Sequence, residues 1–154
     1  KARQLAFFIF IMRIEVLTEL INQQLADEIV STAMLQIFMD SVIDDINAKL
    51  NAKFPTITEW LTTNANTSDY TAIPDRYLRS VVVPGTAFKY YVMDEEGTYA
   101  APKYEQQYKE ALFIMLRDYS MQIPEEYRAE DPQGYVQIAG SDAGLIFPGN
   151  INYD

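Results

Sequence analysis

The strongest constraint on the fold is a stripe of apolar residues that recurs every three or four positions in the first third of the chain. The stripe consists of Leu35, Phe38, Val42, Ile46, Leu50 and Phe54. This spacing places all of its members on one face of a helix. A helix usually ends at or before the residue that precedes a proline, and Pro55 follows the stripe directly. We therefore expect a long helix from about Glu28 to Lys53, with Asp27 as a candidate N-cap.

Three further segments show the same helical period. The first runs from Arg13 to Leu25, and the other two cover about 74–93 and 102–121. Each of the latter two has a proline near its start, a position where proline is tolerated. An acidic turn at 94–97 separates them, so they should form an antiparallel helical hairpin. Pro84-Gly85 interrupts the first hairpin helix and predicts a kink or a short break.

Two weaker patterns lie between these helices. Thr56 to Leu61 could form a single helical turn, and the polar residues 62–69 predict a surface loop. The resulting fold class is all-α, a bundle of about four main helices. We expect residues 13–122 to form this helical domain, preceded by an apolar segment at 1–12 and followed by an arm at 123–154.

The two ends of the chain are apolar without being helical in pattern. Leu5 to Met12 contains eight apolar residues in a row, which is too short to cross a bilayer. We expect a strand or a first helical turn that is buried against a neighbour, and Met12 is an alternative natural start. Glycine and proline punctuate residues 123–154, so this part predicts an extended arm with short strand-like pieces.

The residue types that most often carry catalysis are missing. The 154 residues include no histidine and no cysteine, which excludes the commonest general base, the commonest metal ligand and any thiolate nucleophile. Adjacent carboxylates such as Asp44-Asp45 and Glu125-Glu126 are typical of solvated helix faces and turns. No phosphate-binding loop and no nucleophile elbow is present. We expect a protein that is not an enzyme, with no catalytic residues, no metal site and no cofactor.

The overall charge limits the partners. The formal net charge is −10 and the isoelectric point is near 4.4, so binding to DNA phosphates or to anionic lipid is disfavoured. An acidic surface is still suited to a passage through which DNA slides, because repulsion prevents adhesion.

Tyrosine is distributed unevenly, since all 11 tyrosines lie from Tyr70 onward. Tyrosine offers a large rigid face and a hydroxyl group, which suits surfaces that are buried against another protein. The helical stripes place Tyr77, Tyr104 and Tyr108 in the core. Others lie off the stripes or in the arm, and we expect them to contact neighbouring subunits or neck proteins: Tyr90, Tyr99, Tyr127 and Tyr153.

The stretch from Asp40 to Asp118 resembles the head–tail connector (adaptor) proteins of tailed bacteriophages. Four pieces carry the resemblance. The first is the long helix that ends in Phe54-Pro55. The second is IPDRYLRSVVVPGTAFKYYV at 73–92, and the third is the acidic turn DEEG at 94–97. The fourth is KYEQQYKEALFIMLRD at 103–118.

The resemblance implies a virion protein located in the neck between capsid and tail. Such proteins form a ring, usually of twelve copies, which docks beneath the portal protein and receives the next neck or tail protein. DNA passes through the ring without sequence-specific binding, and no membrane is involved. C-terminal arms of the family commonly grip the portal, which assigns portal contacts to the apolar residues of the arm: Tyr135, Val136, Ile138, Leu145, Ile146 and Phe147. The alternatives are another neck protein, such as a stopper or tail terminator, and a helical protein-binding module unrelated to phages.

Overall fold

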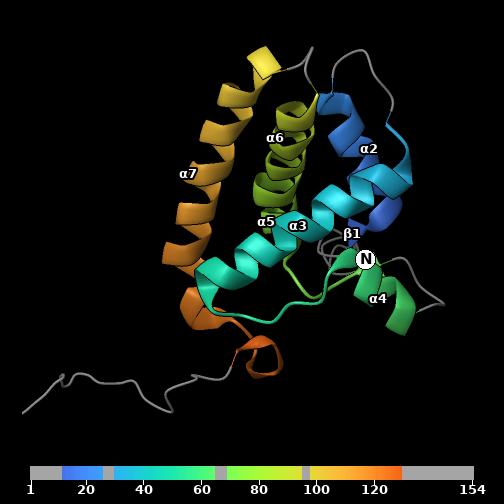
Figure 1. Ribbon diagram of the computed structural model, residues 1–154. Helices are drawn as coiled ribbons and strands as arrows, with labels where there is room; N and C mark the ends of the chain where they lie inside the picture. Colours follow the sequence, from blue (N-terminus) through green and yellow to red (C-terminus); the bar gives the residue numbers. More distant parts are fainter. Residues whose placement is uncertain (1–11, 26–29, 65–68, 95–97, 130–154) are drawn as a thin grey trace, which may run out of the picture.

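The computed structural model describes residues 12–25, 30–64, 69–94 and 98–129. Most of these residues are helical, which confirms the expected all-α class. The main helices are α2 (Ile14–Gln24), α3 (Thr32–Leu50), α4 (Ile57–Thr63), α6 (Val83–Met93) and α7 (Ala101–Tyr119). Figure 1 shows α6 at the centre, with α7 on one side, α2 on the other and α3 crossing the bundle.

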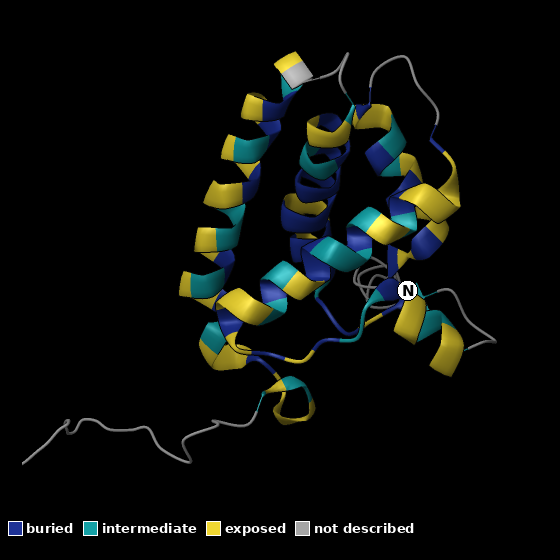
Figure 2. Cartoon of the chain, in the orientation of Figure 1, coloured by how far each residue is buried: buried dark blue, intermediate teal, exposed yellow. Residues whose placement is uncertain are grey.

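The central position of α6 follows from its composition. Every residue from Val81 to Ala87 is buried, and a helix that is apolar on all sides needs neighbours on all sides. Helices α2, α3 and α7 all contact α6. In Figure 2, α7 exposes one full face along its length, whereas α6 is largely buried. Helix α7 is therefore an outer helix of the bundle.

Helices α6 and α7 form the expected antiparallel hairpin (Figure 1). The first hairpin helix is preceded by two short elements, α5 (Asp75–Tyr77) and a π-helical turn, η1 (Leu78–Val82). The N–H group of Val83 bonds to the carbonyl of Leu78, five residues earlier. Pro84 then lies in the first turn of α6, directly after this wide turn. The irregularity that Pro84 predicts is thus a wide turn before the proline, and the helix continues.

Helix α3 is shorter than its stripe suggested. It begins after Ser31, whose hydroxyl accepts a hydrogen bond from the N–H of Met34 at 3.3 Å, so the cap is Ser31 and not Asp27. It ends at Leu50 because Asn51 adopts the left-handed conformation, with φ of 55°. Phe54 is nevertheless buried in the core, from outside the helix. Two bonds hold it there, since the Asn47 side chain accepts from its N–H at 2.8 Å and donates to its carbonyl at 2.9 Å.

The expected turn at Thr56 is helix α4, which extends to Thr63. A capping box begins it, in which Thr56 and Glu59 each bond to the backbone of the other. Met12–Arg13 (β1) and Asp69–Tyr70 (β2) then pair as a short antiparallel ladder. Met12 is 2% exposed. The end of the apolar segment is therefore a strand buried in its own chain, whereas residues 1–11 lie outside the described part.

The start of the expected arm packs against the helical domain. Two 3₁₀ turns, η3 (Ser120–Gln122) and η4 (Glu125–Tyr127), follow α7, and Ile123 between them is buried. The N–H of Lys53 donates to the carbonyl of Tyr127 at 2.8 Å, and the Tyr127 ring contacts Phe54 with centroids 5.4 Å apart. The folded body therefore continues to residue 129 and does not end at 122.

Candidate docking groove between α3 and α7

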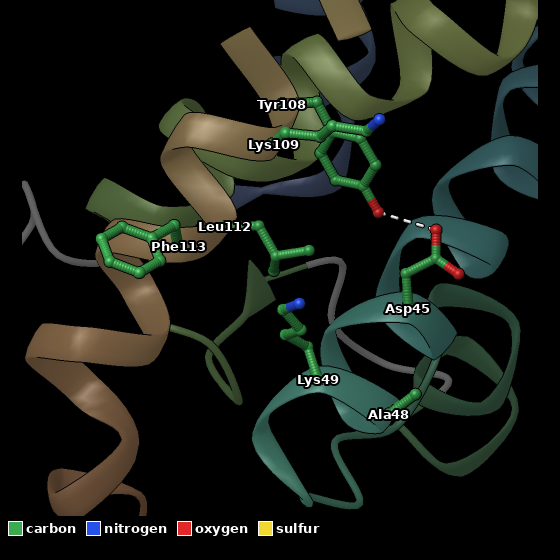
Figure 3. A pocket seen from close by; sticks show the side chains of 7 residues that line it. All are labelled: Asp45, Ala48, Lys49, Tyr108, Lys109, Leu112 and Phe113. Carbon is green, nitrogen blue, oxygen red and sulfur yellow. Dashed lines mark hydrogen bonds between the residues drawn. The ribbon is translucent and has the colours of Figure 1, made fainter. Parts of the chain in front are cut away.

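An open groove of about 510 Å³ lies between α3 and α7 (Figure 3). Each helix contributes residues that are one, three or four positions apart, so each presents one face to the groove. Its lining consists of Asp45, Ala48 and Lys49 from α3 and Tyr108, Lys109, Leu112 and Phe113 from α7. The sequence stripes placed these two helices in one bundle but did not indicate that a groove separates them here.

One wall of the groove is held by a polar cluster around Asp45. Its Oδ2 atom accepts a hydrogen bond from the Tyr108 hydroxyl at 2.7 Å and lies 2.9 Å from Nζ of Lys89 on α6. This carboxylate therefore connects α3, α6 and α7. Burial, together with the hydrogen bond to Asp45, raises the pKa of Tyr108 well above its usual range. The phenol is neutral near pH 7, and the cluster acts as a fixed structural contact.

The α7 side of the groove is apolar and open to solvent. Phe113 is 58% exposed and Ile114 is 43% exposed. A second, smaller hollow of about 380 Å³ is lined by Lys109, Glu110, Phe113 and Ile114. The two hollows share Lys109 and Phe113, so they form one continuous surface that runs from α3 across the outer face of α7. We call this surface the α3–α7 groove.

Two lysines line the same groove. Lys109 forms an exposed ion pair with Glu105 at 2.9 Å, the helical pair that its four-residue spacing predicts. Lys49 forms no ion pair within the described residues. The groove thus combines an apolar floor with both lysines and carboxylates, and Lys49 is its lysine without an ion pair in the described part of the chain.

Among the described residues, no group of three or more carboxylates lies close enough to hold a metal ion. The Asp45 carboxylate already bonds to Tyr108 and Lys89, and Glu110 is the other acidic residue of the lining. In the same part of the chain, no helix is long and apolar enough to cross a membrane.

The tyrosines that were expected at interfaces differ in how far they are buried. Tyr90 is only 8% exposed and packs edge-on against Phe38 of α3 at 6.4 Å. Its assignment to contacts with other subunits is therefore corrected, since it is a core residue. Tyr99 is 87% exposed and remains a candidate contact. Tyr127 is half-buried on Phe54.

The other residues of the predicted site lie outside the described part of the chain. They are the six arm residues Tyr135, Val136, Ile138, Leu145, Ile146 and Phe147, together with Tyr153. The three tyrosines expected in the core, Tyr77, Tyr104 and Tyr108, are all buried there.

Burial of tyrosine is more extensive than the stripes indicated. Tyr91 of α6 and Tyr104 of α7 stack with centroids 5.6 Å apart. Both hydroxyls point to the carbonyl of Gln24 at the end of α2, at 3.5 Å for Tyr91 and 2.9 Å for Tyr104. The excess of tyrosine therefore serves mainly to join helices within the chain.

The helical stripes did not predict that Lys49, Phe113 and Ile114 would line a groove. A signal was present, because Phe113 and Ile114 are apolar yet lie off the α7 stripe of Tyr104, Tyr108, Leu112, Met115 and Tyr119. Two large apolar residues beside a stripe either widen the buried face or remain exposed, and only the packing shows which.

The chain was compared with known families, curated proteins and solved structures. No known family, curated protein or solved structure matches the chain.

Proposed function

We propose that this chain is a structural subunit of a tailed-bacteriophage neck, in which a ring of copies joins the portal of the capsid to the tail. The observation that carries the proposal is the set of large apolar side chains left exposed around a well-buried core. The most exposed of these are Tyr99, Met121, Ile37, Phe113, Met93 and Val92. Clusters of exposed apolar residues mark surfaces that bind other proteins.

These residues fall on more than one face, as a ring requires. Phe113 and Ile114 lie on the outer face of α7, whereas Val92, Met93 and Tyr99 flank the turn between α6 and α7. A subunit in a closed ring uses two different surfaces, one for each neighbour, because the contacts are head-to-tail. Separate apolar patches on one chain supply such a pair of surfaces.

Charge supports a position along a DNA channel. A chain with a net charge of −10 repels phosphate, so DNA that passes through a ring of such subunits is not retained by it. The arm beyond residue 129 supplies the portal contacts in this proposal, through apolar residues such as Val136 and Phe147.

The helical fold favours an adaptor over the strand-rich alternatives among neck proteins. Within the described residues, the strands amount to one two-residue pair. A helical protein-binding module unrelated to phages is the remaining alternative. Sedimentation distinguishes the two, because a module that binds one partner stays monomeric even when portal rings are present.

The direct test is electron microscopy of the purified chain mixed with portal rings. The proposal predicts an additional ring of density at one end of the portal. The double variant Phe113→Asp/Ile114→Asp should weaken ring formation, since it places charge on one patch while leaving the core intact. A matched control is Lys103→Asp on the exposed N-terminal turn of the same helix. Absence of bound density at concentrations well above those of the particles would overturn the proposal.

Truncation tests the arm separately. The cleavage point should follow Ala129, because removal of Ile123 and Tyr127 would damage the core. Binding of the shortened chain to portal rings at unchanged strength would contradict the role of the arm.

A further inference from the structure

We propose that the α3–α7 groove is the binding site for the first part of the chain's own C-terminal segment, residues 130–138. The described body ends beside this groove, Lys49 at that end of the groove carries charge opposite to that of the segment's first residues, and the apolar floor matches the segment's apolar residues.

The point at which the chain leaves the body is determined by backbone contacts. Arg128 pairs with Ala52 in an isolated β-bridge, and the N–H of Ala129 donates to the carbonyl of Asn51 at 3.2 Å. Asn51 follows Lys49 by two residues, and Lys49 lines the groove. Ala129, the last described residue, therefore lies next to one end of the groove.

Charge complementarity favours this segment as the occupant. Residues 130–154 contain four acidic residues, Glu130, Asp131, Asp142 and Asp154, and no lysine or arginine. The first two follow Ala129 directly and start beside Lys49, whose ammonium group forms no ion pair within the described residues. Lys109 on the opposite wall is already paired with Glu105, so Lys49 is the main cation offered to the segment.

The apolar residues of the segment lie within reach of the groove floor. Tyr135 is six residues beyond Ala129, and six residues of extended chain span about 20 Å. Phe113 lies six residues before the end of α7 at Tyr119, which is about 9 Å along the helix axis. Tyr135, Val136 and Ile138 can therefore reach Leu112 and Phe113. Attachment to the same chain gives a local concentration of about a millimolar, so even weak contacts suffice.

This inference concerns the free chain, without portal or tail. In a ring, Phe113 and Val136 exchange this contact within one chain for the subunit and portal contacts proposed above. The two proposals also fail in different experiments, since the groove is tested on the isolated protein.

The absence of cysteine from the sequence makes the test clean. Two variants carry one cysteine pair each: Phe113→Cys with Val136→Cys, and the control Ile37→Cys with Val136→Cys. Ile37 is 68% exposed on the N-terminal half of α3, away from the groove lining. A short bis-maleimide is added to dilute protein, and the products are identified by mass spectrometry. We expect a link within one chain to form about tenfold faster for the 113–136 pair than for the control pair.

Charge reversal provides the second arm of the experiment. Lys49→Glu with Lys109→Glu should slow the 113–136 link about three- to tenfold, because surface ion pairs are individually weak and the reversed charges repel Glu130 and Asp131. Lys103→Glu, on an exposed turn of α7 outside the groove, should leave the rate unchanged.

Three results would overturn the inference. Equal linking rates for the two cysteine pairs would show that the segment has no preferred site. Predominant covalent dimers would assign the groove to a second copy of the chain. A third readout is independent of cysteine: if hydrogen exchange at residues 109–114 is the same in the full chain and in a chain that ends at Ala129, the groove is empty.

Discussion

Gly85 lies where α6 packs closely against both α3 and α7. A Cβ atom at this position would lie 2.8 Å from two ring carbons of Tyr108 on α7 and 3.1 Å from a methyl group of Val42 on α3. Both distances are shorter than van der Waals contact. The Tyr108 ring is itself held by its bond to Asp45, so it cannot turn aside without breaking that contact.

Gly85→Ala should lower the free energy of unfolding by about 1–3 kcal/mol, as is typical for an overpacked core. Urea denaturation followed by circular dichroism measures the change. Ser80→Ala, at an exposed position of the preceding π-helical turn, should leave the stability within about 0.5 kcal/mol. An equally small effect of Gly85→Ala would show that α6 and α7 can separate at little cost.

Tyr108 makes the folded chain less stable as the pH rises above about 10. Burial raises its pKa in the folded chain above the value of 10.0 for a free phenol, so the folded state favours the neutral form. This contribution is complete below pH 10 and is lost as pH rises further, because the unfolded chain ionises first. Burial raises the pKa of Tyr70 in the same direction.

We therefore expect Tyr108→Phe to reduce the loss of stability above about pH 10, without abolishing it, because Tyr70 still contributes. Near pH 7 the same variant should be destabilised by about 1–3 kcal/mol, because Asp45 loses its hydrogen-bond donor. Urea midpoints at a series of pH values measure both effects. Tyr99→Phe, at a position 87% exposed, is the control, and an identical pH profile for the parent and Tyr108→Phe would contradict the prediction.

At the scale of elements, the end of α3 contacts both the α3–α4 loop and the terminal turn of the folded body. Asn51 turns the chain out of the helix, and Asn47 holds Phe54 against the core through two backbone hydrogen bonds. Phe54 in turn supports Tyr127 of the terminal turn. A single helix terminus thus connects the α3–α4 loop with the segment that leads to the arm.

Asn47→Ala should lower the free energy of unfolding by about 1–3 kcal/mol. The substitution removes both side-chain hydrogen bonds to Phe54, so the N–H and carbonyl groups of Phe54 lose these partners. Thermal unfolding measures the loss. Gln36→Ala is the matched control, since the Gln36 side chain also bonds outside its helix, but to an exposed hydroxyl of Thr58 at 3.0 Å. Equal effects of the two substitutions would show that the Phe54 contact has no special weight.

For the whole molecule, the position at which the folded body ends decides what the remaining chain can bind. Ile123 is 3% exposed, and the backbone of 127–129 bonds to the α3–α4 connection. Residues up to 129 are therefore part of the core structure, and only the chain beyond them is available to the groove or to a portal.

A chain that ends after Ala129 should lose only the weak contacts of the segment in the groove, whereas one that ends after Gln122 should lose about 2–4 kcal/mol more. The larger loss follows from removal of the buried Ile123 and of the Tyr127 ring against Phe54. Differential scanning calorimetry of the two shortened chains compares them directly. Equal melting temperatures for all three would place the end of the body at 122, as the sequence pattern suggested.

Local periodicity determined much of this fold. The stripes at 13–25, 74–93 and 102–121 correspond to helices because spacing of three and four residues defines a helix face whatever its neighbours are. Pro84 likewise predicted an irregularity in the helix, and the structure has a π-helical turn directly before it.

The tertiary structure decided what periodicity cannot express. It placed Tyr90 against Phe38 in the core, left Phe113 and Ile114 exposed, and opened the groove between α3 and α7. These outcomes depend on contacts between residues far apart in the sequence. A helical pattern shows which side of a helix is apolar, but only packing shows how much of that side another helix covers.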